Sequence, residues 1–134
     1  MSWRYCLDTS AYSMLRRGEP QVTELIDAAE WIGMPVITLG ELHTGFALGS
    51  RRGENEQIIE EFLADPAVST LDVDASVARI FGELVADLRK AGTPLPTNDV
   101  WIAAQAVRAG ATVLTFDQHF RNMPRVSAQI LVSG

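Results

Sequence analysis

The sequence predicts an α/β fold in which a parallel β-sheet is sandwiched between layers of α-helices. Short apolar runs of strand length alternate along the chain with longer segments whose apolar residues recur at helical spacing. Acidic residues stand directly beyond three of the short runs, at Asp8, Glu41 and Asp117. Parallel sheets covered by helices bind ligands beyond the carboxyl ends of their strands, so these acids are expected to converge there.

Length and composition predict one domain that spans residues 1–134. The hydrophobic content of 47% and the charged content of 21% are typical of a soluble globular protein. No apolar run approaches the ~20 residues of a membrane span, and the N-terminus lacks the pattern of a secretory leader. We therefore expect a cytoplasmic protein with no membrane partner. The single cysteine, Cys6, is expected to be a small buried hydrophobe.

Five strands are predicted from short runs that are rich in aromatic, β-branched and other apolar residues. They cover residues 3–7, 35–37, 68–71, 112–114 and 126–132. The last run is expected at an edge of the sheet.

The first two helices are predicted between the first two strands. A threonine and a serine follow Asp8, and either can cap a helix that runs to about Arg16. Pro20 is placed to open a second helix over residues 21–32, which Gly33 ends.

The middle of the chain contains two further helices. Thr38 and Glu41 match the S/T-x-x-E capping box at the start of the third helix, which explains Glu41 without any chemistry. The polar segment 51–56 is expected to be a mobile loop. A fourth helix around residues 58–63 is ended by Pro66.

The second half of the chain contains the last two helices. Asp74 caps a long helix, and Gly92 ends it. A loop punctuated by proline then leads into the sixth helix, with Thr97 or Asn98 as its cap and Asp99 in its first turn. An acid at this position gains roughly 0.3 to 1 kcal/mol from the helix dipole, so Asp99 also has a purely structural explanation.

Four carboxylates in one crevice would require a metal ion. The acids concerned are Asp8, Glu41, Asp99 and Asp117. Magnesium prefers oxygen ligands and keeps several waters, which suits a site made only of acids. His119 follows Asp117 closely, but no Cys or His spacing typical of a metal site accompanies it, and it is given no role.

The balance of charge argues against a protein that binds nucleic acid with its whole surface, because the net charge is −6. A local contact remains possible, since two pairs of adjacent arginines occur and a guanidinium donates two parallel hydrogen bonds to phosphate. The candidate RNA-binding residues are Arg16, Arg17, Arg51 and Arg52. Solvated helix ends explain the same pairs equally well.

Four short segments carry a resemblance that covers almost the whole chain. They are Leu7-Asp8-Thr9-Ser10, Gly40-Glu41-Leu42, Asn98-Asp99 and Leu114-Thr115-Phe116-Asp117. Together and in this order they resemble the signature segments of PIN-domain ribonucleases, in particular the VapC-like toxins of bacterial toxin-antitoxin pairs. The resemblance implies a three-layer α/β/α fold and an endoribonuclease that depends on Mg²⁺ or Mn²⁺.

The resemblance also implies residue roles and partners. It makes Asp8, Glu41, Asp99 and Asp117 the catalytic acids, with Asp8, Asp99 and Asp117 as metal ligands. Ser10 matches a position that supports the first acid, and Asn98 and Thr115 are expected to help similarly. The implied partners are an RNA substrate, an antitoxin that places a basic side chain near the acids, and a second copy of the chain.

The chemistry expected of such a site is hydrolysis of an RNA phosphodiester bond. Two metal ions about 3.5 to 4 Å apart can activate a water and stabilise the leaving oxygen, although the sequence leaves one or two ions open. Glu41 would bind the same cluster or orient the attacking water. The main alternative is a catalytically silent scaffold that binds a protein or RNA. A phosphotransferase with Asp8 as nucleophile is disfavoured, because Ser10 stands where its second acid is expected.

Overall fold

The computed structural model describes residues 3–132, and its strands form one parallel sheet, as predicted. The strands are β1 (Arg4–Leu7), β2 (Trp31–Pro35), β3 (Val68–Leu71), β4 (Thr112–Thr115) and β5 (Ala128–Ile130). Their order across the sheet is β3-β2-β1-β4-β5, so β1 lies in the centre and β5 at an edge. A residue that follows β1 therefore emerges at the middle of the carboxyl edge.

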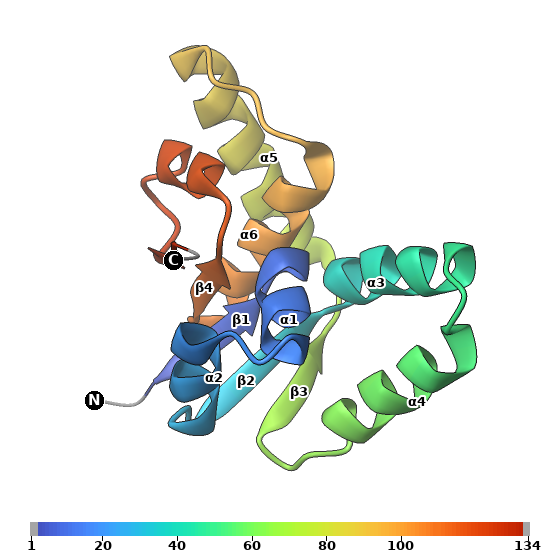
Figure 1. The fold of residues 1–134 in the computed structure, drawn as a ribbon. Helices are drawn as coiled ribbons and strands as arrows, with labels where there is room; N and C mark the ends of the chain where they lie inside the picture. The colour runs from blue at the N-terminus through green and yellow to red at the C-terminus, as the bar shows by residue number, and fades with distance from the viewer. Residues whose placement is uncertain (1–2, 133–134) are drawn as a thin grey trace.

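Within residues 3–132, six α-helices and one short 3-10 helix connect the strands and cover the sheet (Figure 1). They are α1 (Thr9–Arg16), α2 (Pro20–Asp27), α3 (Val36–Leu48), α4 (Arg52–Leu63), α5 (Ala75–Ala91), α6 (Thr97–Ala109) and η1 (Gln118–Asn122). In Figure 1, α1 and α2 lie in front of the sheet, and α5 and α6 rise beside each other towards the top.

Alternation along the central strand divides the core into two layers. Tyr5 and Leu7 pack with residues of α1, α2 and α4, whereas Cys6 between them packs with residues of α5 and α6. Val113 and Leu114 of β4 divide in the same way. Because successive side chains of a strand point to opposite faces, a parallel strand that is covered on both faces is apolar throughout. This arrangement confirms the predicted three layers.

The boundary between α2 and β2 differs from the prediction. The helix ends at Asp27 rather than near residue 32, and the strand occupies Trp31–Pro35 rather than residues 35–37. An apolar run of this length fits either a buried strand or a helix face, and periodicity alone does not distinguish them. Gly33 lies inside this strand and does not end the helix. A larger residue would not fit there, because a Cβ atom would come within 2.7 Å of the Trp31 ring.

The predicted capping box is wrong. α3 begins at Val36, and its N-cap residue, Pro35, makes no side-chain capping bond. Thr38 therefore lies inside the helix, where its buried hydroxyl donates to the carbonyl oxygen of Leu7 at 3.0 Å. The capping explanation of Glu41 is thereby removed.

The segment predicted as a mobile loop is helical over most of its length. α4 begins at Arg52, and the Arg52 Nε donates to Glu56 Oε1 at 3.1 Å, one turn along the same helix. Pairs of opposite charge at this spacing stabilise a helix, which polarity alone does not reveal. Residues 51–56 were therefore wrongly predicted to be a loop.

Capping signals gave mixed results elsewhere. Asp74 caps α5 by accepting from the Val77 amide at 2.9 Å, and Gly92 ends that helix with a φ of 72°, as predicted. At α6 the N-cap residue is Pro96, without a side-chain capping bond, so neither Thr97 nor Asn98 serves as the cap.

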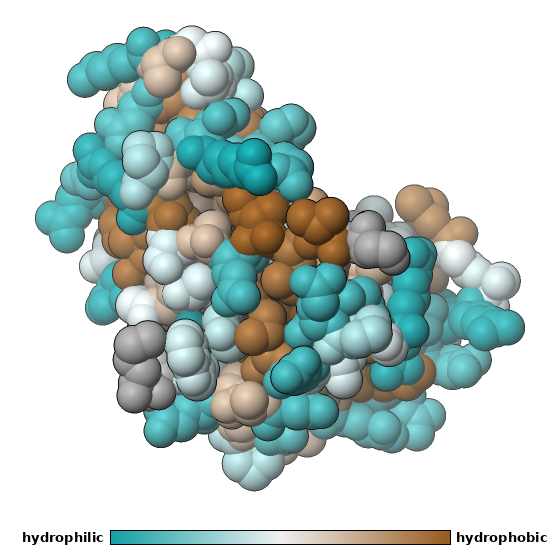
Figure 2. Space-filling view, turned by 60° about the vertical axis from the view of Figure 1, so that its left-hand side comes forward, coloured by the Kyte–Doolittle hydropathy of each residue, from teal (hydrophilic) through white to brown (hydrophobic). Residues whose placement is uncertain are grey.

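A few large apolar side chains are exposed on a surface that is otherwise largely polar. Figure 2 shows apolar residues gathered near the middle of one face, with polar residues around them. The large apolar side chains with substantial exposure are Trp3, Leu48, Val73 and Val132. Within residues 3–132, no helix has the length and apolar character needed to cross a membrane.

Candidate active site

The four predicted acids stand in connections that follow the sheet's strands or in the first turn of α6. Asp8 directly follows β1, and Asp117 lies two residues after β4, which is the neighbour of β1 in the sheet. Glu41 lies in α3, which begins immediately after β2. Asp99 occupies the first turn of α6.

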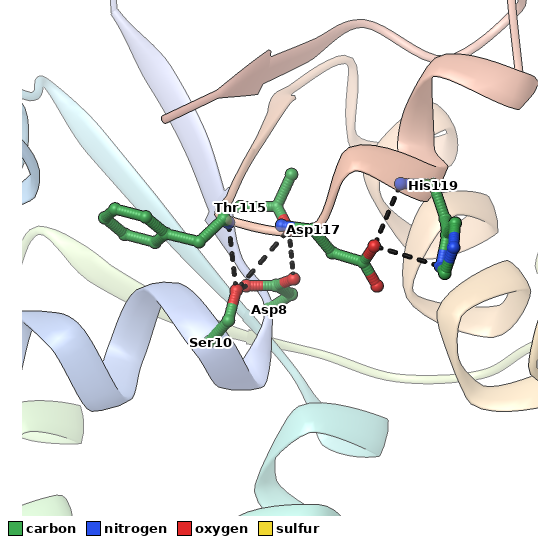
Figure 3. A network of polar contacts seen from close by, with 6 residues as sticks. Asp8, Ser10, Thr115, Asp117 and His119 are labelled. Carbon is green, nitrogen blue, oxygen red and sulfur yellow. Dashed lines mark hydrogen bonds and ion pairs between the residues drawn. The ribbon is translucent and has the colours of Figure 1, made fainter. Parts of the chain in front are cut away.

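Asp8 is buried and held by three hydrogen bonds, and Figure 3 shows it beside Ser10 and Thr115. Its Oδ1 accepts from the Ala11 amide at 2.8 Å and from the Ser10 hydroxyl at 2.7 Å. Its Oδ2 accepts from the Thr115 hydroxyl. Asp8, rather than a following hydroxyl residue, is thus the N-cap of α1. An ionised carboxylate has about four acceptor positions, so Asp8 keeps one for a further ligand.

Two hydroxyl groups connect the start of α1 to the segment after β4. Ser10 Oγ donates to Asp8 and accepts from the Phe116 amide at 3.0 Å. Thr115 Oγ1 also donates to Asp8, and it accepts from the Asp117 amide at 2.9 Å. Ser10 therefore joins Asp8 to the Phe116 amide, and Thr115 joins it to the Asp117 amide.

His119 contacts Asp117 in a way that the sequence analysis missed. Asp117 Oδ1 accepts from the backbone amide of His119 at 2.9 Å and lies 3.1 Å from its Nδ1 (Figure 3). The side chain of His119 is exposed. The only signal in the sequence was its spacing of two residues from the acid.

The sequence analysis did not predict that Thr9 contacts Glu41. Its hydroxyl donates to Glu41 Oε1 at 2.6 Å and so joins the start of α1 to α3. Asn98, in contrast, is exposed at the start of α6. Within the described part of the chain, no hydrogen bond joins the Asn98 side chain to the acids.

The pKa of Asp99 indicates that the other three acids lie within electrostatic range of it. Burial raises it most, and repulsion from Asp117, Asp8 and Glu41 adds to this, while His119 acts in the opposite direction. The resulting pKa is about 6, compared with an ordinary value of 3.8. Like charges at short range disfavour ionisation, so Asp99 is repelled by all three of the other acids.

The pKa of Asp8 is also raised, for a different balance of causes. Burial is the largest cause of the increase. Hydrogen bonds from Thr115, Ala11 and Ser10 stabilise the charged form and therefore lower the pKa. Repulsion from Asp117 raises the pKa further. Asp8 is therefore an acid whose charge is costly in this site, which is the condition that a bound cation relieves.

The donor set fits a hard divalent cation, although the side chains do not form a complete cage. Within residues 3–132, no three Asp, Glu, His or Cys side chains are close enough together to hold a metal ion. Electrostatic repulsion acts over longer distances than metal ligation, so the acids can repel one another without being placed as ligands. Magnesium retains several waters and needs only one or two carboxylates, and the oxygen donors here suit it.

The two predicted arginine pairs differ in their surroundings. A groove of about 610 Å³ between α1, α3 and α4 is lined by Arg16, Arg17 and Arg51. Arg52 does not line this groove and pairs instead with Glu56. The structure thus brings three of the four arginines together.

Comparison with known proteins identifies the fold and its family. The family description "PIN domain" matches residues 5–126, a span that contains all four acids. The chain belongs to the PIN domain family. Among curated PIN relatives, Ribonuclease VapC4 of Mycobacterium tuberculosis is 38% identical over 103 residues, which are 72% of this chain and 74% of that protein.

Solved structures show the same PIN fold. VapBC-5 of Mycobacterium tuberculosis, described as a member of the VapBC family of toxin-antitoxin systems, aligns with a TM-score of 0.74 and 28% identity. The alignment covers 96% of this chain and 98% of that chain. DNA-bound VapBC from Salmonella typhimurium aligns with a TM-score of 0.84 over 96% of this chain and 98% of that one. At 24% identity this second likeness concerns the fold alone.

Proposed function

We propose that this PIN domain is a metal-dependent endoribonuclease and the toxin of a toxin-antitoxin pair. The observation that carries the proposal is the hydrogen-bond network that holds Asp8 against the segment carrying Asp117. Repulsion of Asp99 by Asp117, Asp8 and Glu41 supports it. The ribonuclease name of VapC4 and the likeness to VapBC-5 support the two parts of the proposal.

Asp8, Asp99 and Asp117 would hold the Mg²⁺ or Mn²⁺ ion, in part through the waters that such an ion retains. When bound, such an ion activates a water as nucleophile and stabilises the charge of the leaving oxygen. The chain's own contribution is to fix the acids, since Ser10 and Thr115 hold Asp8 against the segment that carries Asp117.

Glu41 is proposed to orient the attacking water or to complete the same cluster. Its Oε1 accepts from Thr9, which fixes the carboxylate and leaves Oε2 to accept a proton from a water. His119 is proposed to hold Asp117 in position through the two contacts made by its backbone amide and its Nδ1.

Cleavage of RNA by purified protein tests this proposal. We expect cleavage with Mg²⁺ or Mn²⁺, none in EDTA, and a loss of at least about a hundredfold in Asp8→Asn or Asp99→Asn, since both are proposed to position the catalytic ion. Asp72→Asn is the matched control, because Asp72 is an exposed acid outside the crevice. Cleavage by repurified Asp99→Asn at the wild-type rate would rule out the assignment and favour the silent scaffold.

We further propose that a cognate antitoxin suppresses this activity by placing a basic side chain near the acids. The crevice favours such a contact, because a cation there relieves the repulsion on Asp99. The antitoxin should therefore compete with Mg²⁺, and raising the Mg²⁺ concentration should weaken its inhibition.

A further inference from the structure

The groove between α1, α3 and α4 is lined by more positive than negative charge. Arg16 and Arg17 lie at the end of α1, and Arg51 is the N-cap residue of α4. Among the ion pairs of residues 3–132, none includes these three arginines. In a chain with a net charge of −6, the groove is thus a local reversal of sign.

The same groove begins beside the acidic crevice. Tyr12 and Leu42 line it, and each lies within one turn of Thr9 or Glu41, whose side chains are joined by a hydrogen bond of 2.6 Å. α1 rises about 1.5 Å per residue, so the arginines at its end stand about 12 Å along the helix axis from the acid at its start. A single RNA strand that follows the groove can therefore contact both the acids and the arginines.

We propose that this groove binds the phosphates of the single-stranded RNA segment that flanks the cleaved bond. The inference rests on the proposed ribonuclease function and adds the path of the substrate. Three guanidiniums supply phosphate contacts, and aromatic residues next to a cationic groove can stack bases. Phe46 lines the groove and packs edge-on against the exposed His43, with ring centroids 5.6 Å apart.

The proposal also predicts that replacing Glu54 changes RNA binding in the opposite direction to replacing the arginines. Within the described lining of the groove it is the only acid, and it is exposed in the first turn of α4. A carboxylate beside bound phosphates repels them, so Glu54→Gln should strengthen RNA binding. A groove that binds a basic protein segment would respond in the opposite direction.

The test is RNA binding without cleavage. Fluorescence anisotropy of a labelled single-stranded oligonucleotide is measured in EDTA over a range of salt concentrations. The combined variant Arg16→Ala, Arg17→Ala, Arg51→Ala should bind about tenfold more weakly or worse at low salt. Its salt slope should fall by about 2, because each lost phosphate contact removes about 0.7.

Arg52→Ala is the matched control, because Arg52 neighbours Arg51 but does not line the groove. It should change the slope little, and single Arg→Gln variants replace the triple variant if that variant does not fold. An unchanged slope in the arginine variants, or weaker binding by Glu54→Gln, would overturn the proposal.

Failure of this inference is distinguishable from failure of the proposed function. Arginine-dependent RNA binding without metal-dependent cleavage would retain the groove and reject the ribonuclease. Cleavage that requires Asp99 but shows no dependence on the groove arginines would retain the ribonuclease and reject the groove. Loss of binding to a protein partner with unchanged RNA binding would assign the groove to that partner.

Discussion

Asp99 is a residue at which folding and charge conflict. Its pKa is raised to about 6, first by burial and then by repulsion from Asp117, Asp8 and Glu41. A carboxyl group whose pKa is raised on folding binds more protons in the folded state. Its contribution to stability is therefore fully present below its ordinary pKa of 3.8 and is lost as the pH rises through about 6.

Replacing Asp99 by Asn should stabilise the protein in EDTA near pH 7. The variant removes a charge that is half-buried and repelled, so we expect a gain of about 1 kcal/mol after allowing for solvent screening, or a few degrees in melting temperature. The gain should shrink as the pH falls towards 4, where the wild-type carboxyl group is protonated. Thermal melts of both proteins across this pH range measure the effect.

Adding Mg²⁺ to the same melts separates the two explanations of Asp99. Binding to the folded state should raise the wild-type melting temperature more than that of the variant. A variant that is less stable in EDTA, together with no Mg²⁺ effect on wild type, would instead identify Asp99 as an acid that stabilises the helix dipole.

At the scale of single residues, the sequence predicted the acids better than the contacts that orient them. Asp8 and Asp117 could be placed because each follows an apolar strand, and neighbouring parallel strands end at one edge. The bond between Thr9 and Glu41 joins positions 32 residues apart. A local partner for Glu41, the capping box with Thr38, was available in the sequence, and only the tertiary fold excludes it.

At the scale of secondary-structure elements, β2 contains a glycine, Gly33, whose lack of a side chain leaves room for the Trp31 ring. The nearest atom of the Trp31 ring lies 2.7 Å from the position that a Cβ atom of Gly33 would occupy. The ring is held there, because its Nε1 donates to Ser69 at 3.1 Å and the Arg4 guanidinium lies 4.1 Å from its centroid. The indole therefore has little freedom to move away.

Gly33→Ala should destabilise the protein by about 1 to 3 kcal/mol, the usual range for overpacking a core. Gly82→Ala is the matched control, since a Cβ at Gly82 meets no atom within 4 Å and the residue is exposed on α5. That substitution should stabilise the helix by roughly 0.5 to 1 kcal/mol. Urea unfolding of both variants measures the difference, and equal effects would contradict the packing of Trp31 against Gly33.

The extent of each element was predictable where a local signal existed. Pro20, Asp74 and Gly92 mark helix ends in the structure as they do in the sequence. The boundary between α2 and β2 was not predictable, because its residues are apolar at both helical and strand spacing. Pairing with β1 and β3 resolves the ambiguity, and such long-range pairing is not visible in a local window.

For the whole molecule, we expect a homodimer. The expectation rests on the family resemblance and on apolar side chains that remain exposed, including Trp3, Leu48 and Val132. Burying such groups against a second copy removes apolar surface from water. Light scattering at micromolar concentration should give twice the chain mass of 14.7 kDa, and a monomer mass would contradict the dimer.

The pairing of β1 with β4 also determines when the site exists during synthesis. Thr115, which holds the carboxylate of Asp8, is added to the chain 107 positions after it. Until then, the central strand lacks one of its two neighbours, because β4 does not yet exist. A nascent chain on the ribosome, surrounded by RNA, thus cannot assemble the acid network before Thr115 and Asp117 have been translated.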